Sequence, residues 1–184
     1  MGNSKVLILP GWEGSGPSHW QMRWVNQWAY QVLEQHDWMR PLRGDWLARL
    51  EDVVSELEAP VYLVAHSLGC IQIAAWAQIS KQRHKVKGAF LVAPGDVEAS
   101  HLQDVFSTWR PIALTALPFK STLIGSQNDP FCSAARAEYF ANAWGSQFVN
   151  LGEMGHVNAE SNLGDWPEGH ALLNELMKDT EHGH

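Results

Sequence analysis

Residues 61–70 read VYLVAHSLGC, and this stretch decides the fold. A run of strand-forming residues, Val61–Ala65, is followed by His66 and Ser67, and a helix-like sequence begins at Leu68. A short and continuously apolar strand is typical of a parallel sheet that is buried on both faces. The sequence therefore predicts that Ser67 lies at the carboxyl end of a buried strand, in the turn that leads into a helix.

Apolar strands alternate with helical patterns along the whole chain. The alternation predicts one α/β domain over residues 1–184, with a mostly parallel sheet of about six strands and helices on both faces. We expect the last residues, 179–184, to form a mobile tail. The expected strands cover residues 6–10, 61–65, 89–93, 122–125 and 148–151, and the expected helices cover 19–32 (after an N-cap at Ser18), 45–59, 68–80, 133–144 and 167–178.

The composition restricts the class of protein. A length of 184 residues is enough to bury one core, and a net charge of −7 with scattered lysine and arginine disfavours a nucleic-acid partner. No segment has the length and apolarity of a membrane span or the pattern of a signal peptide, so we expect no membrane contact. Two cysteines, Cys70 and Cys132, are too few for a disulfide framework, which favours packed, reduced thiols in a cytoplasmic protein.

The serine at the strand end belongs to a known type of turn. The sequence Ala65-His66-Ser67-Leu68-Gly69 differs at one position from G-x-S-x-G, the sharp strand-to-helix turn that exposes a nucleophilic serine. Chemistry in such sheets collects at the carboxyl ends of the strands, and amides at the start of the following helix can stabilise an oxyanion. Ser67 is therefore a candidate nucleophile, although a serine here could also act only as a helix cap.

A nucleophilic serine requires a base and an acid that orients the base. In hydrolases built on such a sheet, the three residues follow the chain order serine, acid, histidine. Asp129 and His156 occur in that order after Ser67, and each lies just beyond a predicted strand. These positions predict a catalytic triad at one edge of the sheet. Asp96, which follows the preceding strand, is the alternative acid, and Asp129 would also suit a simple turn.

The glycine-rich loop after the first strand completes the predicted site. The backbone N–H groups of Leu68 and Trp12 are the expected oxyanion donors, because Gly11 lets the chain turn just before Trp12. Gly11, Trp12, His19 and Trp20 are the candidates to line a substrate pocket. For both tryptophans, packing in the core is an equal alternative.

The remaining histidines and cysteines indicate no second kind of site. His66 adjoins the nucleophile, but we expect it to point away and to have a structural role. The sequence contains neither H-E-x-x-H nor a paired C-x-x-C, so zinc chemistry has little support and no metal site is expected. Ten tryptophans are unusual at this length, and for most of them we expect packing in the core or on helix faces.

Five segments resemble the YdeN and retinoblastoma-binding-protein-9 family of small serine hydrolases. They are residues 11–21 (GWEGSGPSHWQ), 66–69 (HSLG), 128–131 (NDPF), 155–158 (GHVN) and 164–167 (GDWP). The resemblance implies a minimal α/β-hydrolase fold without a large lid domain. It also implies a triad of Ser67, His156 and Asp129, and no metal or organic cofactor.

The residues and the resemblance together predict a serine hydrolase that transfers an acyl group to Ser67. Small carboxylic esters are the expected substrates, and small amides or peptides are the alternative. A hydrolase fold does not by itself guarantee turnover. The competing hypothesis is therefore a protein-binding module with an idle site.

Overall fold

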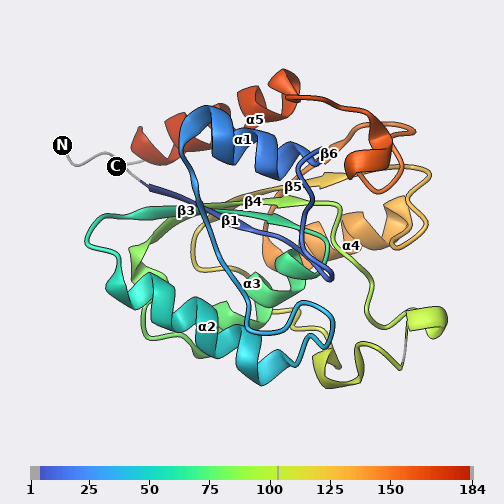
Figure 1. Cartoon of the computed structure of the whole chain (residues 1–184), viewed down its shortest axis with the longest axis horizontal. Helices are drawn as coiled ribbons and strands as arrows, with labels where there is room; N and C mark the ends of the chain where they lie inside the picture. Colours follow the sequence, from blue (N-terminus) through green and yellow to red (C-terminus); the bar gives the residue numbers. More distant parts are fainter. Residues whose placement is uncertain (1–4, 103, 183–184) are drawn as a thin grey trace.

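A six-stranded parallel sheet forms the centre of the protein (Figure 1). The computed structural model describes residues 5–102 and 104–182. The strands lie in the order β2-β1-β3-β4-β5-β6 and every neighbouring pair is parallel, so their carboxyl ends meet at one edge. The strands are β1 Lys5–Leu9, β2 Gln31–Val32, β3 Val61–His66, β4 Val86–Val92, β5 Lys120–Gly125 and β6 Gln147–Asn150.

Helices cover both faces of the sheet. α1 and α5 lie on one face, and α2, α3 and α4 lie on the other (Figure 1). No helix in the described part of the chain is both long and apolar enough to cross a membrane. The α-helices are α1 Trp20–Trp28, α2 Arg43–Glu56, α3 Leu68–Ile79, α4 Ala134–Trp144 and α5 Pro167–Glu181, and the short 3-10 helices are η1 Arg83–Lys85, η2 Ser100–Leu102, η3 Ser107–Trp109 and η4 Ala159–Ser161.

Alternate residues of each strand face opposite helix layers. In β1, Val6 and Ile8 pack in the cluster that includes α1 and α5, whereas Leu7 and Leu9 pack with the helices of the other face. All four side chains are buried. Because both faces of the sheet are covered, the strands have to be apolar at every position, which is the pattern seen in the sequence.

The structure confirms the predicted α/β class with six parallel strands, but it corrects the region after β1. The helix expected to reach Val32 ends at Trp28, because Ala29 adopts a left-handed conformation with φ of 53°. Residues Gln31–Val32 instead form β2, an edge strand that pairs with β1. A strand of two residues is too short to produce a recognisable hydrophobic pattern.

Other boundaries also differ from the prediction. The N-cap of α1 is His19 rather than Ser18, and the Nδ1 atom of His19 accepts a hydrogen bond from a backbone N–H of the first turn. α5 continues to Glu181, so residues 179–181 form its last turn instead of a mobile tail. Residues 183–184 of the expected tail lie outside the described residues.

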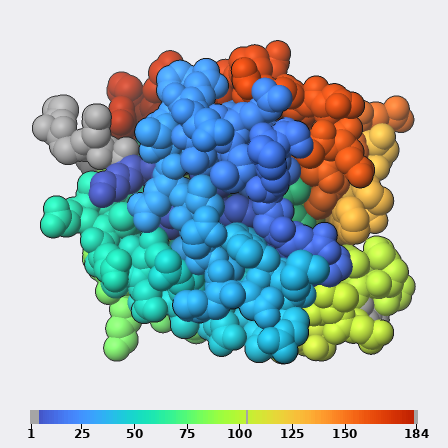
Figure 2. All heavy atoms as spheres, viewed as in Figure 1, coloured from blue at the N-terminus to red at the C-terminus, as the bar shows by residue number. Residues whose placement is uncertain are grey.

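Most of the tryptophans are packing residues, as predicted. Seven of the ten are at most 3% exposed, whereas Trp28 is 48% exposed. Trp20 and Trp24 of α1 pack against Trp166, which directly precedes α5. In the space-filling view, the blue surface of α1 accordingly lies against the orange surface of residues near 160–170 (Figure 2). The aromatic cluster thus joins two segments that are far apart in the sequence.

Replacement of Gly69 by alanine is expected to destabilise the fold. A methyl group at Gly69, in the first turn of α3, would lie 2.5 Å from the carbonyl oxygen of Leu9. Overpacking of this kind lowers the free energy of unfolding by about 1–3 kcal/mol. The matched control is Gly44→Ala in α2, where no atom lies within 4 Å of the added methyl group. Urea denaturation should show the control to be at least as stable as the original protein. Equal stability of both variants would contradict the close contact at Gly69.

Candidate active site

Ser67 alone makes the turn between β3 and α3. Its backbone has φ of 54° and ψ of −119°, a conformation that is strained for a residue with a side chain. The turn requires small neighbours, because α3 starts directly against the sheet. A methyl group at Gly69 would lie 2.5 Å from the Leu9 carbonyl oxygen and 3.3 Å from the Cβ of Ala65, so position 69 requires a glycine.

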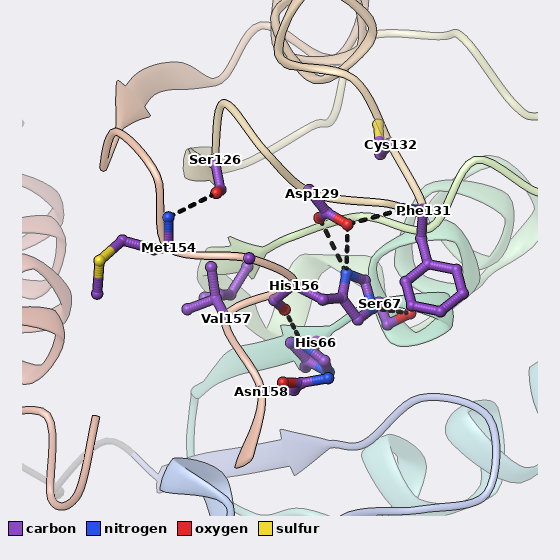
Figure 3. A network of polar contacts seen from close by, with 12 residues as sticks. His66, Ser67, Ser126, Asp129, Phe131, Cys132, Met154, His156, Val157 and Asn158 are labelled. Atoms are coloured by element: carbon purple, nitrogen blue, oxygen red, sulfur yellow. Dashed lines mark hydrogen bonds and ion pairs between the residues drawn. The ribbon is translucent and has the colours of Figure 1, made fainter. Parts of the chain in front are cut away.

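A chain of hydrogen bonds links Ser67, His156 and Asp129 (Figure 3). Ser67 Oγ lies 2.9 Å from His156 Nε2, and His156 Nδ1 lies 3.0 and 2.9 Å from the two carboxylate oxygens of Asp129. A carboxylate only accepts, so Nδ1 carries the proton and Nε2 is free to accept from the serine hydroxyl. The Asp129 side chain is 2% exposed, and its Oδ1 also accepts the N–H of Phe131 at 2.9 Å.

These three residues come from three loops at the same edge of the sheet. Ser67 follows β3, Asp129 follows β5 and His156 follows β6. Asp96, the alternative acid, does not contact His156 but forms an ion pair with Arg136, with Nε and Oδ2 3.1 Å apart. Of the two candidate acids, Asp129 is therefore the one that contacts His156.

The loop after β1 passes directly over the serine turn. A methyl group at Gly11 would lie 2.9 Å from Ser67 Cβ and 3.2 Å from the backbone nitrogen of Leu68. Within residues 5–102 and 104–182, the backbone N–H groups of Leu68 and Trp12 donate no hydrogen bond to a protein acceptor. Gly95 lies in the loop that follows β4, and a methyl group at this residue would lie 3.2 Å from Ser67 Oγ. Gly95 is thus a residue of this site in addition to those predicted from the sequence.

A cleft of about 350 Å³ opens in front of Ser67. Gly11, Trp12 and His19, which were expected at the pocket, line this cleft, together with His66. Its apolar wall consists of Val97, Leu102, Phe106 and Phe131. Most of this wall belongs to the irregular segment between β4 and β5, which has no periodic pattern from which the sequence could predict it.

Trp20 does not line the cleft, contrary to the expectation. Its side chain is 1% exposed, and its indole Nε1 donates a hydrogen bond of 2.8 Å to the backbone carbonyl of Val157. The sequence suggested core packing as the alternative for Trp20, and the structure shows that alternative.

His19 and His66 are two buried, neutral histidines beside the triad. Burial, with a smaller effect from His156, lowers the pKa of His19 to about 4, and burial lowers the pKa of His66 well below its usual range. The His66 ring lies 4.7 Å from the His19 ring and 4.8 Å from the His156 ring, centre to centre. Because Nδ1 of His19 accepts the N-cap hydrogen bond, its Nε2 carries a proton, and this buried N–H has no partner among the described residues.

Both cysteines are buried free thiols. Burial raises the pKa of Cys70 well above its usual range. Burial raises the pKa of Cys132 to about 12, and the nearby carboxylates of Asp96 and Asp129 add to the shift. Neither residue is therefore a thiolate at neutral pH. In the described residues, no group of three or more histidine, cysteine or acidic side chains is arranged to hold a metal ion.

The doubly covered parallel sheet, with a strained serine at the end of β3, defines the α/β-hydrolase class, and the solved structures that it resembles include α/β-hydrolases. A family model described as serine hydrolase matches residues 6–175, so the chain belongs to the serine hydrolase family.

The chain is similar to several known proteins. It is 30% identical to YdeN of Bacillus subtilis (strain 168) over 95 residues, which are 48% of this chain and about half (50%) of that relative. A YdeN-like protein of Pectobacterium atrosepticum is 28% identical, with a TM-score of 0.86 over 97% of this chain and 92% of the other. The carboxylesterase CesB of Bacillus subtilis shares the fold at 14% identity, with a TM-score of 0.61 over 100% of this chain and 86% of the other.

The low pKa of His19 predicts a loss of stability in acid. The unfolded chain binds a proton at this histidine below pH 6.5, whereas the folded protein binds it only near pH 4. The folded state is therefore destabilised as the pH falls, and His19 contributes about 2 kcal/mol to this loss between neutral pH and about pH 4.5. Asparagine also caps helices but does not titrate, so His19→Asn should lose less stability over the same range. Urea denaturation at both pH values checks this, and an equal loss in the two proteins would contradict it.

Proposed function

We propose that this serine hydrolase is an esterase that acts by acyl transfer to Ser67. The observation that carries the proposal is the unbroken chain of hydrogen bonds from Ser67 Oγ through the His156 imidazole to the buried carboxylate of Asp129. A serine hydroxyl is a weak nucleophile by itself, and this arrangement is the one that activates it.

In the acylation step, His156 Nε2 takes the proton of Ser67 as Oγ attacks the carbonyl carbon of the ester. His156 then carries a positive charge, which the adjacent Asp129 carboxylate stabilises. When the tetrahedral intermediate collapses, Nε2 gives the proton to the departing alkoxide, and the alcohol leaves. In the second step, His156 Nε2 takes a proton from water as the water oxygen attacks the carbonyl carbon of the acyl-enzyme. When this second tetrahedral intermediate collapses, Nε2 returns the proton to Ser67 Oγ, and the carboxylic acid leaves.

The negative oxygen of the tetrahedral intermediate requires hydrogen-bond donors. We assign this role to the backbone N–H groups of Leu68 and Trp12. The close approach of Gly11 to Ser67 and to the Leu68 nitrogen supports the assignment, as does the lack of protein acceptors for both N–H groups in the described residues. Each donor of this kind typically contributes about 10²–10³ to turnover.

The cleft supports small carboxylic esters as the substrate class. Its volume of about 350 Å³ suits a small molecule, and its wall of Val97, Leu102, Phe106 and Phe131 suits an apolar group. The shared fold of the carboxylesterase CesB agrees with an ester substrate. Small amides and peptides require the same chemistry and are the second substrates to test.

Ser67→Ala is expected to lower ester turnover by at least about 10⁴, because the variant lacks the nucleophile. The first measurement is labelling with a fluorophosphonate probe, followed by mass spectrometry of the adduct. Labelling confined to Ser67, absent from Ser67→Ala and from His156→Ala, would support the proposal. A folded protein that neither reacts with the probe nor hydrolyses any ester would contradict it and favour the protein-binding alternative.

A pair of aspartate variants tests the role of the acid. Asp129→Asn preserves the shape of the side chain but replaces one accepting oxygen by a donor nitrogen and removes the negative charge that stabilises the charged imidazole, so kcat should fall by about 10³–10⁴. The matched control is Asp96→Asn, which weakens an ion pair with Arg136 outside the triad. This control should keep kcat within about threefold, because partly exposed ion pairs contribute little. Similar losses in the two variants would contradict the assignment of Asp129.

A further inference from the structure

The backbone just after the candidate base is strained. Val157 follows His156 and has φ of 48°, in the left-handed region. This conformation is uncommon for any residue with a side chain, and for a β-branched residue it is an outlier. Backbone strain of this kind persists only where the surroundings hold the chain in place. Val157 is fully buried, so its surroundings are the protein itself.

Two side-chain donors hold the carbonyl groups on either side of this strained position. His66 Nε2 lies 2.8 Å from the backbone carbonyl of His156 (Figure 3), and Trp20 Nε1 lies 2.8 Å from the backbone carbonyl of Val157. A carbonyl only accepts, so both nitrogens donate, and Nε2 is the protonated nitrogen of His66. The His66 and Trp20 side chains are both buried, which shields the two hydrogen bonds from water.

We infer that His66 and Trp20 are positioning residues, which hold the main chain of residues 156–157 so that the His156 imidazole meets Ser67 and Asp129 together. We call this pair the carbonyl clamp. The effect of the clamp on turnover rests on the proposed function, whereas the clamp itself consists of the hydrogen bonds from His66 and Trp20 to the two carbonyl groups. His66 directly precedes Ser67, so it links the strand of the nucleophile to the loop of the base.

The first half of the histidine loop is held from a different direction. The N–H of Met154 donates to Ser126 Oγ at 3.0 Å, and the N–H of Gly155 donates to Asn128 Oδ1 at 2.7 Å. These contacts connect the loop of the base to the loop that carries Asp129. In the carbonyl clamp, His66 attaches the same loop to the strand that carries Ser67. The loop of His156 is therefore held both to the Asp129 loop and to the Ser67 strand.

The clamp residues are themselves fixed by their surroundings. Trp20 is the first residue of α1, and the N-cap of that helix, His19, packs its ring edge-on against His66. Gln21 is fully buried, and its side-chain amide donates to the carbonyl of Leu9 at 3.1 Å, which attaches α1 to β1. Neither clamp residue can move without disturbing these contacts. Positional errors near 1 Å can reduce turnover by about 10²-fold, so this rigidity matters for catalysis.

Glutamine and methionine at position 66 provide a matched test. The side-chain amide nitrogen of glutamine lies about as far along the side chain as histidine Nε2, whereas methionine has a similar length and no donor. His66→Met should lower kcat by about 10–100-fold with a smaller change in KM, because the base is misplaced while methionine keeps a side chain of similar length beside the cleft. His66→Gln should restore most of kcat. A merely structural role for His66 would not produce this difference between kcat and KM, nor its rescue.

A second matched pair tests the tryptophan. Trp20→Phe removes the indole donor and keeps an aromatic ring, and kcat should fall by about 10-fold. The control is Trp144→Phe in α4, which removes an equally buried indole N–H that donates to the carbonyl of Ala113 at 2.7 Å. Both variants should lose similar stability in urea, but only Trp20→Phe should lose turnover.

The proton on Nδ1 of His156 provides a readout that does not depend on turnover. A histidine proton held by a buried carboxylate has a low-field NMR resonance, which should be sharp in the original protein and in His66→Gln. It should shift or broaden in His66→Met and Trp20→Phe. Unchanged kcat and an unchanged resonance in these two variants would overturn the clamp. If the original protein hydrolyses no ester but the resonance responds as expected, the proposed function fails and the clamp stands.

Discussion

The close contact between the end of β1 and the start of α3 is the constraint on which the rest of the site depends. Gly69 lies against the Leu9 carbonyl, and Gly11 lies against Ser67, so that no side chain fits at either glycine. With the helix this close to the sheet, one residue has to make the whole turn. That residue is Ser67, and its strained backbone directs Oγ away from the sheet edge. The approach of Gly11 to Ser67 also brings the loop after β1 close to the backbone nitrogen of Leu68, the first residue of α3.

Two strained backbone positions lie beside the reacting atoms. Ser67 and Val157 both have positive φ angles, and they lie on the two sides of the hydrogen bond between the serine and His156. Folded proteins tolerate such conformations where a rigid core compensates for them. Here the compensation comes from the doubly covered sheet, from the tryptophan cluster of α1 and from the hydrogen bonds that tie the three loops together.

Charged residues near the site have a different role from the triad. Arg136 of α4 binds both Asp96 and Glu98, and Glu98 also accepts the backbone N–H of Ile112 at 2.9 Å. These contacts attach the irregular segment after β4 to the body of the protein, and that segment supplies the apolar wall of the cleft. The carboxylate that resembles an alternative catalytic acid in the sequence, Asp96, is thus one partner of a partly exposed ion pair outside the triad.

The sequence by itself determined the parallel α/β class, the serine turn after β3, and the order in which Asp129 and His156 follow. These features depend on local patterns: continuous apolar strands, small residues in a tight turn, and polar residues just beyond a strand. Only the tertiary structure decided which acid meets His156, where the apolar wall lies, and that Trp20 belongs to the support of the loop and not to the pocket. The Trp20 hydrogen bond joins residues that are 137 positions apart. A donor and an acceptor at such a separation have no common local pattern, because the folding of the intervening chain alone brings them into contact.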